Sequence, residues 1–310
     1  MKRKTFTLFS IILVAIICII FLNIGEKEAS FREVKANGYR NINPIEKAPV
    51  TVDVEVTGKN AILLDKDTGR ILFSKNGEEK IYPASTTKIM TALIALENGN
   101  LHDYITVGNE AALKLQGEST AYLAEGQVLT LEELLSGLLL QSGNDAARTI
   151  AIHIAKEVGN NPNFSNEEAL AYFAGLMNKK AKEVGAKDTH FVNPNGLHDP
   201  NHYTTALDMT LITKEALKNE QFQQLVSRET YSDGKVTYHN TNRLLKKNDP
   251  YYFEGANGIK TGFTTEAGRC LISSVSRDGR NLLSFVFHST GKGVYSDTIA
   301  LFNAGLGLNQ

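Results

Sequence analysis

Several features that would define a metal, disulfide or nucleotide-binding protein are missing from the sequence. Its two cysteines, Cys18 and Cys270, are too few for a disulfide framework or a cysteine-rich zinc site. It contains no P-loop, no G-x-G-x-x-G motif and no internal repeat. Because 33 basic and 34 acidic residues give a net charge of −1, no nucleic-acid partner is expected. A compact enzyme or binding protein of 310 residues remains.

A metal site is not expected either. His198 and His202 are four residues apart, but Pro200 lies between them and the sequence has no His-Glu-x-x-His motif. Both histidines are predicted to lie in a loop, and no metal or other cofactor is implied. Cys270 is interpreted as a small buried strand residue, because a lone thiol without a basic partner is a poor nucleophile.

Residues 1–25 contain the one long apolar run. Three basic residues at positions 2–4 precede an almost wholly apolar segment over residues 6–24. A run of about 20 residues can cross a membrane as a helix, and the preceding positive charge places the N-terminus in the cytoplasm. The run is longer than the roughly 7–15 residues of a signal-peptide core and lacks a small-x-small cleavage site. A retained single-pass membrane anchor is therefore favoured over a cleaved signal peptide.

The rest of the chain divides into a linker and one domain. Residues 26–50 are polar and mixed in charge, as is typical of a linker. Folding signals begin near Thr51, so residues 51–310 are predicted to form a domain outside the cytoplasm. This domain would be held at the cell membrane, or secreted if the N-terminal segment is removed.

Strand patterns occur at both ends of this domain, and helical patterns fill its middle. The β-rich runs, which form two predicted hairpins, are residues 61–64 with 70–73 and residues 270–275 with 282–287. Capping-box sequences at residues 130–133 and 165–168 open amphipathic helices between the hairpins. A closing helix is expected over residues 294–303. The prediction is an α/β (α+β) fold with one antiparallel sheet, built from early and late segments, and a mostly helical subdomain inserted between them.

The first candidate catalytic motif is Ser-x-x-Lys, formed by Ser85 and Lys88. A serine at the start of a helix lies beside free N–H groups, and a lysine three residues later shares its face. A buried amine with a lowered pKa can take the proton of the hydroxyl. By itself the motif is weak, because it also occurs at Ser232 and Ser289, and Ser85 alone would fit an ordinary helix N-cap.

Two further motifs strengthen this interpretation. Ser142-Gly143-Asn144 falls in a predicted loop between two apolar helices, and Lys260-Thr261-Gly262 comes before the late strand pair. Alone, the first would fit a helix–helix turn, and the second would fit an exposed edge strand guarded by a lysine. Ser-x-x-Lys, Ser-x-Asn and Lys-Thr-Gly in this order, on a helix start, a loop and a strand, form a highly specific set.

With this set, the chain resembles the penicillin-recognising serine enzymes, and specifically the low-molecular-mass D-alanyl-D-alanine carboxypeptidases. The resemblance covers nearly all of the chain from about residue 51. Residues 82–92 are similar to the nucleophile segment of this subgroup, and residues 196–209 are similar to a further family signature. The resemblance implies a β-lactamase/transpeptidase-like fold.

The resemblance also implies roles for the residues that carry the reaction. Ser85 would attack the peptide carbonyl between two terminal D-alanines, with Lys88 as its general base. Ser142 would relay a proton to the leaving amine. The backbone N–H groups of Ser85 and Phe263 would form an oxyanion hole.

The remaining motif residues would bind the substrate. Asn144 would hold both the substrate backbone and Lys88. Lys260 and Thr261 would bind the free terminal carboxylate, and Gly262 would let the substrate approach the strand backbone closely.

The implied activity is removal of the terminal D-alanine from peptidoglycan stem pentapeptides through an acyl-enzyme, which β-lactam antibiotics would block covalently. An endopeptidase that cleaves cross-links between stems would use the same residues. A β-lactamase is disfavoured because no obvious deacylating glutamate follows Asn144. A silent penicillin-binding receptor is disfavoured because Ser85, Lys88 and Lys260 are all present.

The chain departs from the family pattern in two places. Many relatives continue into an all-β domain and a C-terminal amphipathic helix, whereas this chain ends at Gln310, so the N-terminal run is expected to provide the membrane attachment. Some relatives use a late arginine to hold the substrate carboxylate. No arginine follows Arg280 here, which leaves Lys292 as a candidate for that contact.

Overall fold

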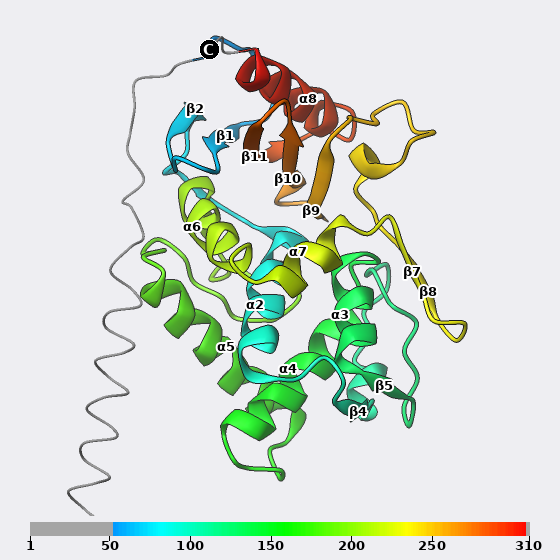
Figure 1. Cartoon of the computed structure of the whole chain (residues 1–310). Helices are drawn as coiled ribbons and strands as arrows, with labels where there is room; N and C mark the ends of the chain where they lie inside the picture. The colour runs from blue at the N-terminus through cyan, green and yellow to red at the C-terminus, as the bar shows by residue number, and fades with distance from the viewer. Residues whose placement is uncertain (1–51, 308–310) are drawn as a thin grey trace, which may run out of the picture. The chain divides into compact units, whose positions relative to one another are not determined.

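The early and late hairpins predicted from the sequence meet in one antiparallel sheet. In the computed structural model, β1 (Asn60–Asp65) pairs with β2 (Ile71–Lys75), and β10 (Gly268–Arg277) pairs with β11 (Arg280–Ser289). With β9 (Ala256–Thr264) at one edge, the strand order is β2-β1-β11-β10-β9. In Figure 1 the blue strands therefore lie beside the orange ones, although they come from opposite ends of the domain. This confirms the predicted sheet.

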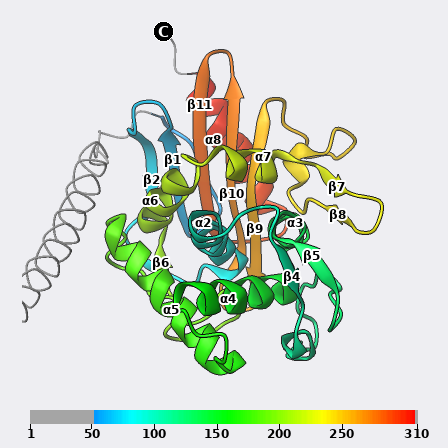
Figure 2. The ribbon, with the colours of Figure 1, turned by 60° about the horizontal axis from the view of Figure 1, so that its bottom comes forward.

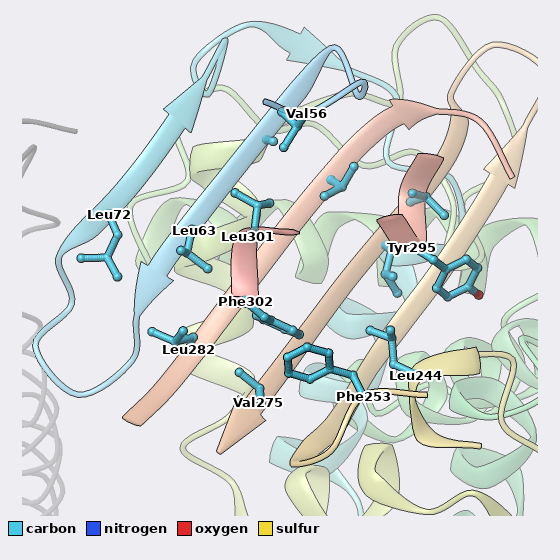
Figure 3. Packing of buried hydrophobic residues seen from close by; sticks show 14 of the residues in the cluster. Val56, Leu63, Leu72, Leu244, Phe253, Val275, Leu282, Tyr295, Leu301 and Phe302 are labelled. Atoms are coloured by element: carbon cyan, nitrogen blue, oxygen red, sulfur yellow. The ribbon is translucent and has the colours of Figure 1, made fainter. Parts of the chain in front are cut away.

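Both faces of the sheet are covered, since the middle strands carry apolar residues on each side. The closing helix, α8 (Gly293–Leu306), packs on one face, and the inserted helices pack on the other, as Figure 2 shows. Figure 3 shows Leu63 and Leu282 of the sheet in one apolar cluster with Leu301 and Phe302 of α8. All four side chains are fully buried, so α8 is an integral part of the core.

The inserted subdomain is built around α2, whose first eight residues are all buried. The helices of this subdomain are α2 (Lys88–Asn98), α3 (Leu131–Leu139), α4 (Asn144–Val158), α5 (Asn166–Glu183), α6 (Ala206–Ala216) and α7 (Glu220–Ser227). Each of α3 to α7 contacts α2. The predicted capping boxes are both present, with Thr130 and Ser165 as the N-cap residues of α3 and α5.

Several short elements, which the sequence patterns did not predict, lie before, between and after these helices. The short strands are β3 (Lys80–Ile81) with β6 (Thr204–Thr205), β4 (Tyr104–Thr106) with β5 (Val128–Thr130), and β7 (Thr230–Ser232) with β8 (Thr237–His239). The 3-10 helices are η1 (Ala84–Thr87), η2 (Asn109–Ala112) and η3 (Arg243–Leu245). The β3–β6 pair lies close to the site in sequence, because η1 begins shortly after β3; β6 leads directly into α6.

The structure describes residues 52–307. The predicted membrane segment, residues 1–25, and the predicted linker, residues 26–50, lie outside this range. Within the described part of the chain, no helix combines the length and the apolar character that a membrane crossing requires.

Candidate active site

The three sequence motifs line one cleft between the sheet and the helical subdomain. The cleft has a volume of about 1080 Å³ and is lined by residues of all three motifs, among them Ser85, Ser142, Asn144 and Thr261. Its walls come from η1, the loop between α3 and α4, and β9. The structure thus brings together residues that are up to 177 positions apart in the sequence.

Ser85 lies in η1, one short turn before α2, rather than at the N-cap of α2 itself. Lys88 is the first residue of α2, and its Nζ lies 2.9 Å from Ser85 Oγ. The turn is tightly held: Ala84 has a φ of 47°, and Gly196 packs so closely that a Cβ on it would lie 1.8 Å from the Ala84 carbonyl oxygen. The close contact explains why a glycine occupies position 196.

Three oxygen atoms surround the Lys88 amine. Nζ lies 2.9 Å from Ser85 Oγ, 2.6 Å from Asn144 Oδ1 and 2.7 Å from the carbonyl oxygen of Asn195. The side chain is fully buried, and burial, followed by the nearby charge of Lys260, lowers the pKa of Lys88 well below its usual value. A neutral amine would donate to the amide and carbonyl oxygens and keep its lone pair for the Ser85 hydroxyl proton.

The Ser142 loop is fixed from behind by close packing and by backbone contacts. Ser142 is buried and has a φ of 62°. A Cβ on Gly143 would lie 2.7 Å from the Ala121 side chain, so only glycine fits between the two segments. Asp145 at the start of α4 accepts a 2.7 Å hydrogen bond from the backbone N–H of Ala121 and a 3.0 Å bond from that of Leu123.

Lys260 lies on the edge strand β9, but its side chain is not exposed to solvent. Its side chain is 1% exposed because η1 and α7 cover this part of the strand. Burial lowers the pKa of Lys260 to about 7, and Nζ donates a 3.0 Å hydrogen bond to the Thr261 carbonyl oxygen. The Thr261 hydroxyl lies 2.7 Å from that of Thr241. The alternative interpretation, an edge-strand lysine facing solvent, is therefore wrong.

The next two residues of β9 bring the strand against the nucleophile turn. A Cβ on Gly262 would lie 3.1 Å from the Ser85 backbone nitrogen, so the two backbones approach closely at this point. Phe263 is 52% exposed at the cleft, and the Arg269 guanidinium lies 4.1 Å from its ring centroid. The Ser85 N–H thus lies next to β9, the strand that carries Phe263, the other residue of the predicted oxyanion hole.

His202 supports the nucleophile turn, and His198 does not share this role. The Val192 N–H donates to His202 Nδ1 at 3.1 Å, which leaves the proton on Nε2 to donate to Thr87 Oγ1 at 2.8 Å. Thr87 Oγ1 in turn donates to the Ala84 carbonyl oxygen at 2.8 Å. Burial lowers the pKa of His202 to about 4, so the ring is neutral.

His198 lies at the cleft rim, 4.0 Å from Glu266. Residues 52–307 contain no group of three or more histidine, cysteine, aspartate or glutamate side chains that could hold a metal ion. Cys270 is buried in β10, and burial raises the pKa of its thiol to about 12, which agrees with its interpretation as a buried strand residue.

Sequence reasoning missed several residues of the site. Glu118 and Arg148 form an ion pair behind Asn144, and the Asn195 carbonyl contacts Lys88. Arg243 and Arg269 line the cleft. Lys292, the candidate for the carboxylate contact that a late arginine makes in some relatives, lines it as well. Arg148 follows Asn144 by four residues on α4, but no local spacing links it to Glu118, or the cleft arginines to the motifs, because these residues come from separate segments. Asn195 acts through its backbone, which leaves no side-chain signal.

A half-buried serine lies beside a buried lysine with a lowered pKa. A second serine lines the same cleft, and a second buried lysine lies on the adjacent strand β9. These features define a serine hydrolase. The chain belongs to the D-alanyl-D-alanine carboxypeptidase family, whose model matches residues 45–291.

Curated relatives carry the same description. D-alanyl-D-alanine carboxypeptidase DacF of Bacillus subtilis is 38% identical over 247 residues, which make up 76% of this chain and 59% of that protein. D-alanyl-D-alanine carboxypeptidase DacC of Escherichia coli is 32% identical over 235 residues, or 73% of this chain and 55% of the relative. The matches therefore span little more than half the length of these two relatives.

Solved structures of similar proteins confirm the predicted fold. The Streptomyces K15 DD-transpeptidase superimposes with a TM-score of 0.74 and 29% identity, covering 85% of this chain and 100% of that chain. Penicillin-binding protein D2 of Listeria monocytogenes, solved with bound cefotaxime, gives a TM-score of 0.68 and 25% identity, covering 82% and 99% of the two chains.

Proposed function

We propose that this protein is a serine-type D-alanyl-D-alanine carboxypeptidase that removes the terminal D-alanine from peptidoglycan stem pentapeptides. The observation that carries this proposal is the 2.9 Å contact between Lys88 Nζ and Ser85 Oγ, with the lysine buried and its pKa lowered. A nucleophile beside a neutral amine is equipped to form an acyl-enzyme at neutral pH.

In the acylation step, Lys88 takes the proton of the Ser85 hydroxyl as Oγ attacks the carbonyl carbon of the penultimate D-alanine. The tetrahedral oxyanion is stabilised by the N–H groups of Ser85 and Phe263. The C–N bond then breaks, and the departing amine of the last D-alanine receives a proton through Ser142. The products are free D-alanine and an ester on Ser85, which water hydrolyses in a second step.

Residues of β9 bind the free terminal carboxylate of the substrate. The Lys260 charge is held away from water, where its attraction for a carboxylate is screened less than at the surface. Thr261 adds a hydroxyl at the cleft wall. A β-lactam carries a carboxylate at the matching position and an amide bond in a strained ring, so the same groups would direct it to Ser85 and leave a stable acyl-enzyme.

Two substrates and one variant test the proposal. The full-length chain is incubated separately with a stem pentapeptide and with a cross-linked dimer of stem peptides, and free D-alanine and dimer cleavage are measured. We expect D-alanine from the pentapeptide and no loss of the dimer. Cleavage of the dimer instead would assign the chain to the endopeptidase alternative.

The matched variant is Ser85→Ala. It should abolish both D-alanine release and covalent labelling by a fluorescent penicillin, because both acylate the same oxygen. Labelling that persists would place the nucleophile elsewhere, with Ser142 as the next candidate.

We further propose that residues 6–24 anchor the protein in the cell membrane, with the catalytic domain on the outer side where stem peptides are found. The support is the apolar run and the three basic residues before it. Membrane fractions should contain the full-length chain, with residues 51–310 accessible to protease from outside. Recovery of a mature N-terminus near Ser30 would show a cleaved signal peptide instead.

A further inference from the structure

A buried ion pair lies directly behind the amide that contacts the Lys88 amine. Arg148 of α4 binds Glu118 through both terminal guanidinium nitrogens, Nη2 to Oε1 at 2.5 Å and Nη1 to Oε2 at 3.3 Å. The two side chains are only 5% and 1% exposed. Asn144 Nδ2 donates to the same Glu118 carboxylate at 3.2 Å, while its Oδ1 lies 2.6 Å from Lys88 Nζ.

We propose that Glu118 and Arg148 are positioning residues for the general base: Glu118 fixes the orientation of the Asn144 amide, and Arg148 balances the charge that Glu118 places near Lys88. The inference rests on the proposed function, because it assigns these residues to the acylation step. Neither residue needs to touch the substrate for this role.

The amide orientation follows from the donors and acceptors around it. Lys88 Nζ donates to Asn144 when the amide oxygen faces it, whereas the reversed amide would direct its NH₂ group at the amine and compete with Ser85 for the amine lone pair. A carboxylate accepts hydrogen bonds and cannot donate them, so Glu118 selects the orientation in which Nδ2 faces away from Lys88. The bidentate contact with Arg148 holds the carboxylate in place for this task.

The charge balance follows from the sign of each neighbour. The negative charge of Glu118 raises the pKa of Lys88, and the positive charge of Arg148 lowers it. The charged and titratable groups that face Lys88 are Glu118, Lys260 of β9, Asp145 and Arg148 of α4, and the neutral His202. Removing one member of the pair leaves the other uncompensated, so the two single variants should change the pKa of Lys88 in opposite directions.

The experiment tests whether the two single variants shift the acid limb of the pH–rate profile, where Lys88 loses its proton, in opposite directions. The second-order rate of acylation by a fluorescent penicillin is followed against pH for the full-length wild type, Arg148→Met, Glu118→Gln and the double variant. Arg148→Met should move the acid limb up by about one pH unit, which lowers the rate about tenfold on that limb. Glu118→Gln should move the acid limb down, since the glutamine keeps an acceptor for Asn144 but removes the negative charge. The double variant should return close to the wild-type limb.

Two further variants separate positioning from general damage to the fold. Lys180→Met breaks a partly buried ion pair far from Lys88, in which Lys180 Nζ lies 2.7 Å from Glu97 near the end of α2; it should change the melting temperature and leave the acid limb in place. Arg148→Lys should restore most of the limb position, because it restores the charge. If Arg148→Met does not fold, Glu118→Gln still tests the direction of the shift, with Arg148→Lys as the variant whose limb should stay in place.

Acid limbs that stay in place, or that move the same way in both single variants, would overturn the inference. The proposed function fails separately, through a wild type that is not labelled at Ser85. A labelled wild type with unmoved limbs would leave the carboxypeptidase proposal intact and remove only this role for Glu118 and Arg148.

Discussion

Two buried lysines lie at the candidate active site, Lys88 on α2 and Lys260 on β9, and their surroundings differ. Both have a lowered pKa. Lys88 has three oxygen atoms within hydrogen-bond distance of Nζ, whereas Lys260, within residues 52–307, donates one hydrogen bond, to the Thr261 carbonyl. Within the described residues the Lys260 amine thus uses one of its donors, which fits its proposed role as the binder of a substrate carboxylate.

This difference fits the two proposed roles, general base for Lys88 and carboxylate binder for Lys260. A base must be neutral before the reaction, so Lys88 needs acceptors that hold it in place without a counter-ion beside it. A carboxylate binder must be charged when substrate arrives, and burying an unpaired charge destabilises the fold. We therefore expect the buried Lys260 amine to destabilise the free enzyme, and a bound substrate carboxylate to offset this destabilisation.

The largest effect should come from Lys88→Arg. The substitution keeps a positive charge near Ser85 but introduces a group with a pKa above about 12, which cannot act as a base. Acylation by a fluorescent penicillin should fall by at least the roughly 10²–10⁴-fold that is typical of the loss of a general base.

The guanidinium is longer than the amine and could displace Ser85, so the melting curve is needed as a control. A Lys88→Arg protein that melts like the wild type and still acylates within about tenfold of its rate would show that Lys88 provides only electrostatic stabilisation.

The fold and the three motifs could be predicted because their signals are local. Turn residues between β-rich runs marked the hairpins, and Thr130 and Ser165 marked helix starts through capping boxes that the structure contains. The order of the three motifs along the chain indicated the family. These signals depend on residues a few positions apart, and a sequence displays such spacings directly.

The electrostatics of the site could not be predicted in this way. The sequence gives no sign that Lys260 on an edge strand is covered by η1 and α7, because that burial depends on segments far away in the chain. Glu118 and Arg148 are 30 positions apart and meet only when α4 packs beside the preceding loop. Burial and long-range pairing decide the pKa values, so the chemistry of the cleft required the structure.

A smaller effect, on stability, separates the two lysines. Lys260→Met should raise the melting temperature by a few degrees, because it replaces a buried, poorly compensated amine with an apolar side chain of similar length; about 1 kcal/mol corresponds to roughly 2–4 °C in a domain of this size. Lys88→Met should lower it, because the oxygens of Asn144 and Asn195 lose their donor.

The pH dependence of this stability effect has a definite sign. The pKa of Lys260 is about 7 in the folded protein, below that of a lysine in the unfolded chain, so the folded state binds fewer protons between these values. The stability of the wild type should therefore rise with pH above about 7. The gain from Lys260→Met, measured by thermal melting, should be larger at pH 6 than at pH 9; equal gains would mean that Lys260 carries no burial penalty.

The smallest effect is a shift in a pH profile, and it tests whether Lys260 awaits a carboxylate. In the free enzyme, Lys88 must lose its proton and Lys260 must keep its own, so kcat/KM for D-alanine release should rise on an acid limb and fall on an alkaline limb near the Lys260 pKa of about 7. The two amines repel each other, so the limbs report the pair rather than either residue alone.

A bound carboxylate favours the charged form of Lys260 and should move the alkaline limb of kcat to higher pH than that of kcat/KM. A pentapeptide with an amidated C-terminus lacks this carboxylate, so its kcat/KM should be low and should lose the alkaline limb, since a charged Lys260 gives it no advantage. Equal alkaline limbs for the free acid and the amide would mean that the limb belongs to another group. The proposed role of Lys260 as the carboxylate binder would then be wrong.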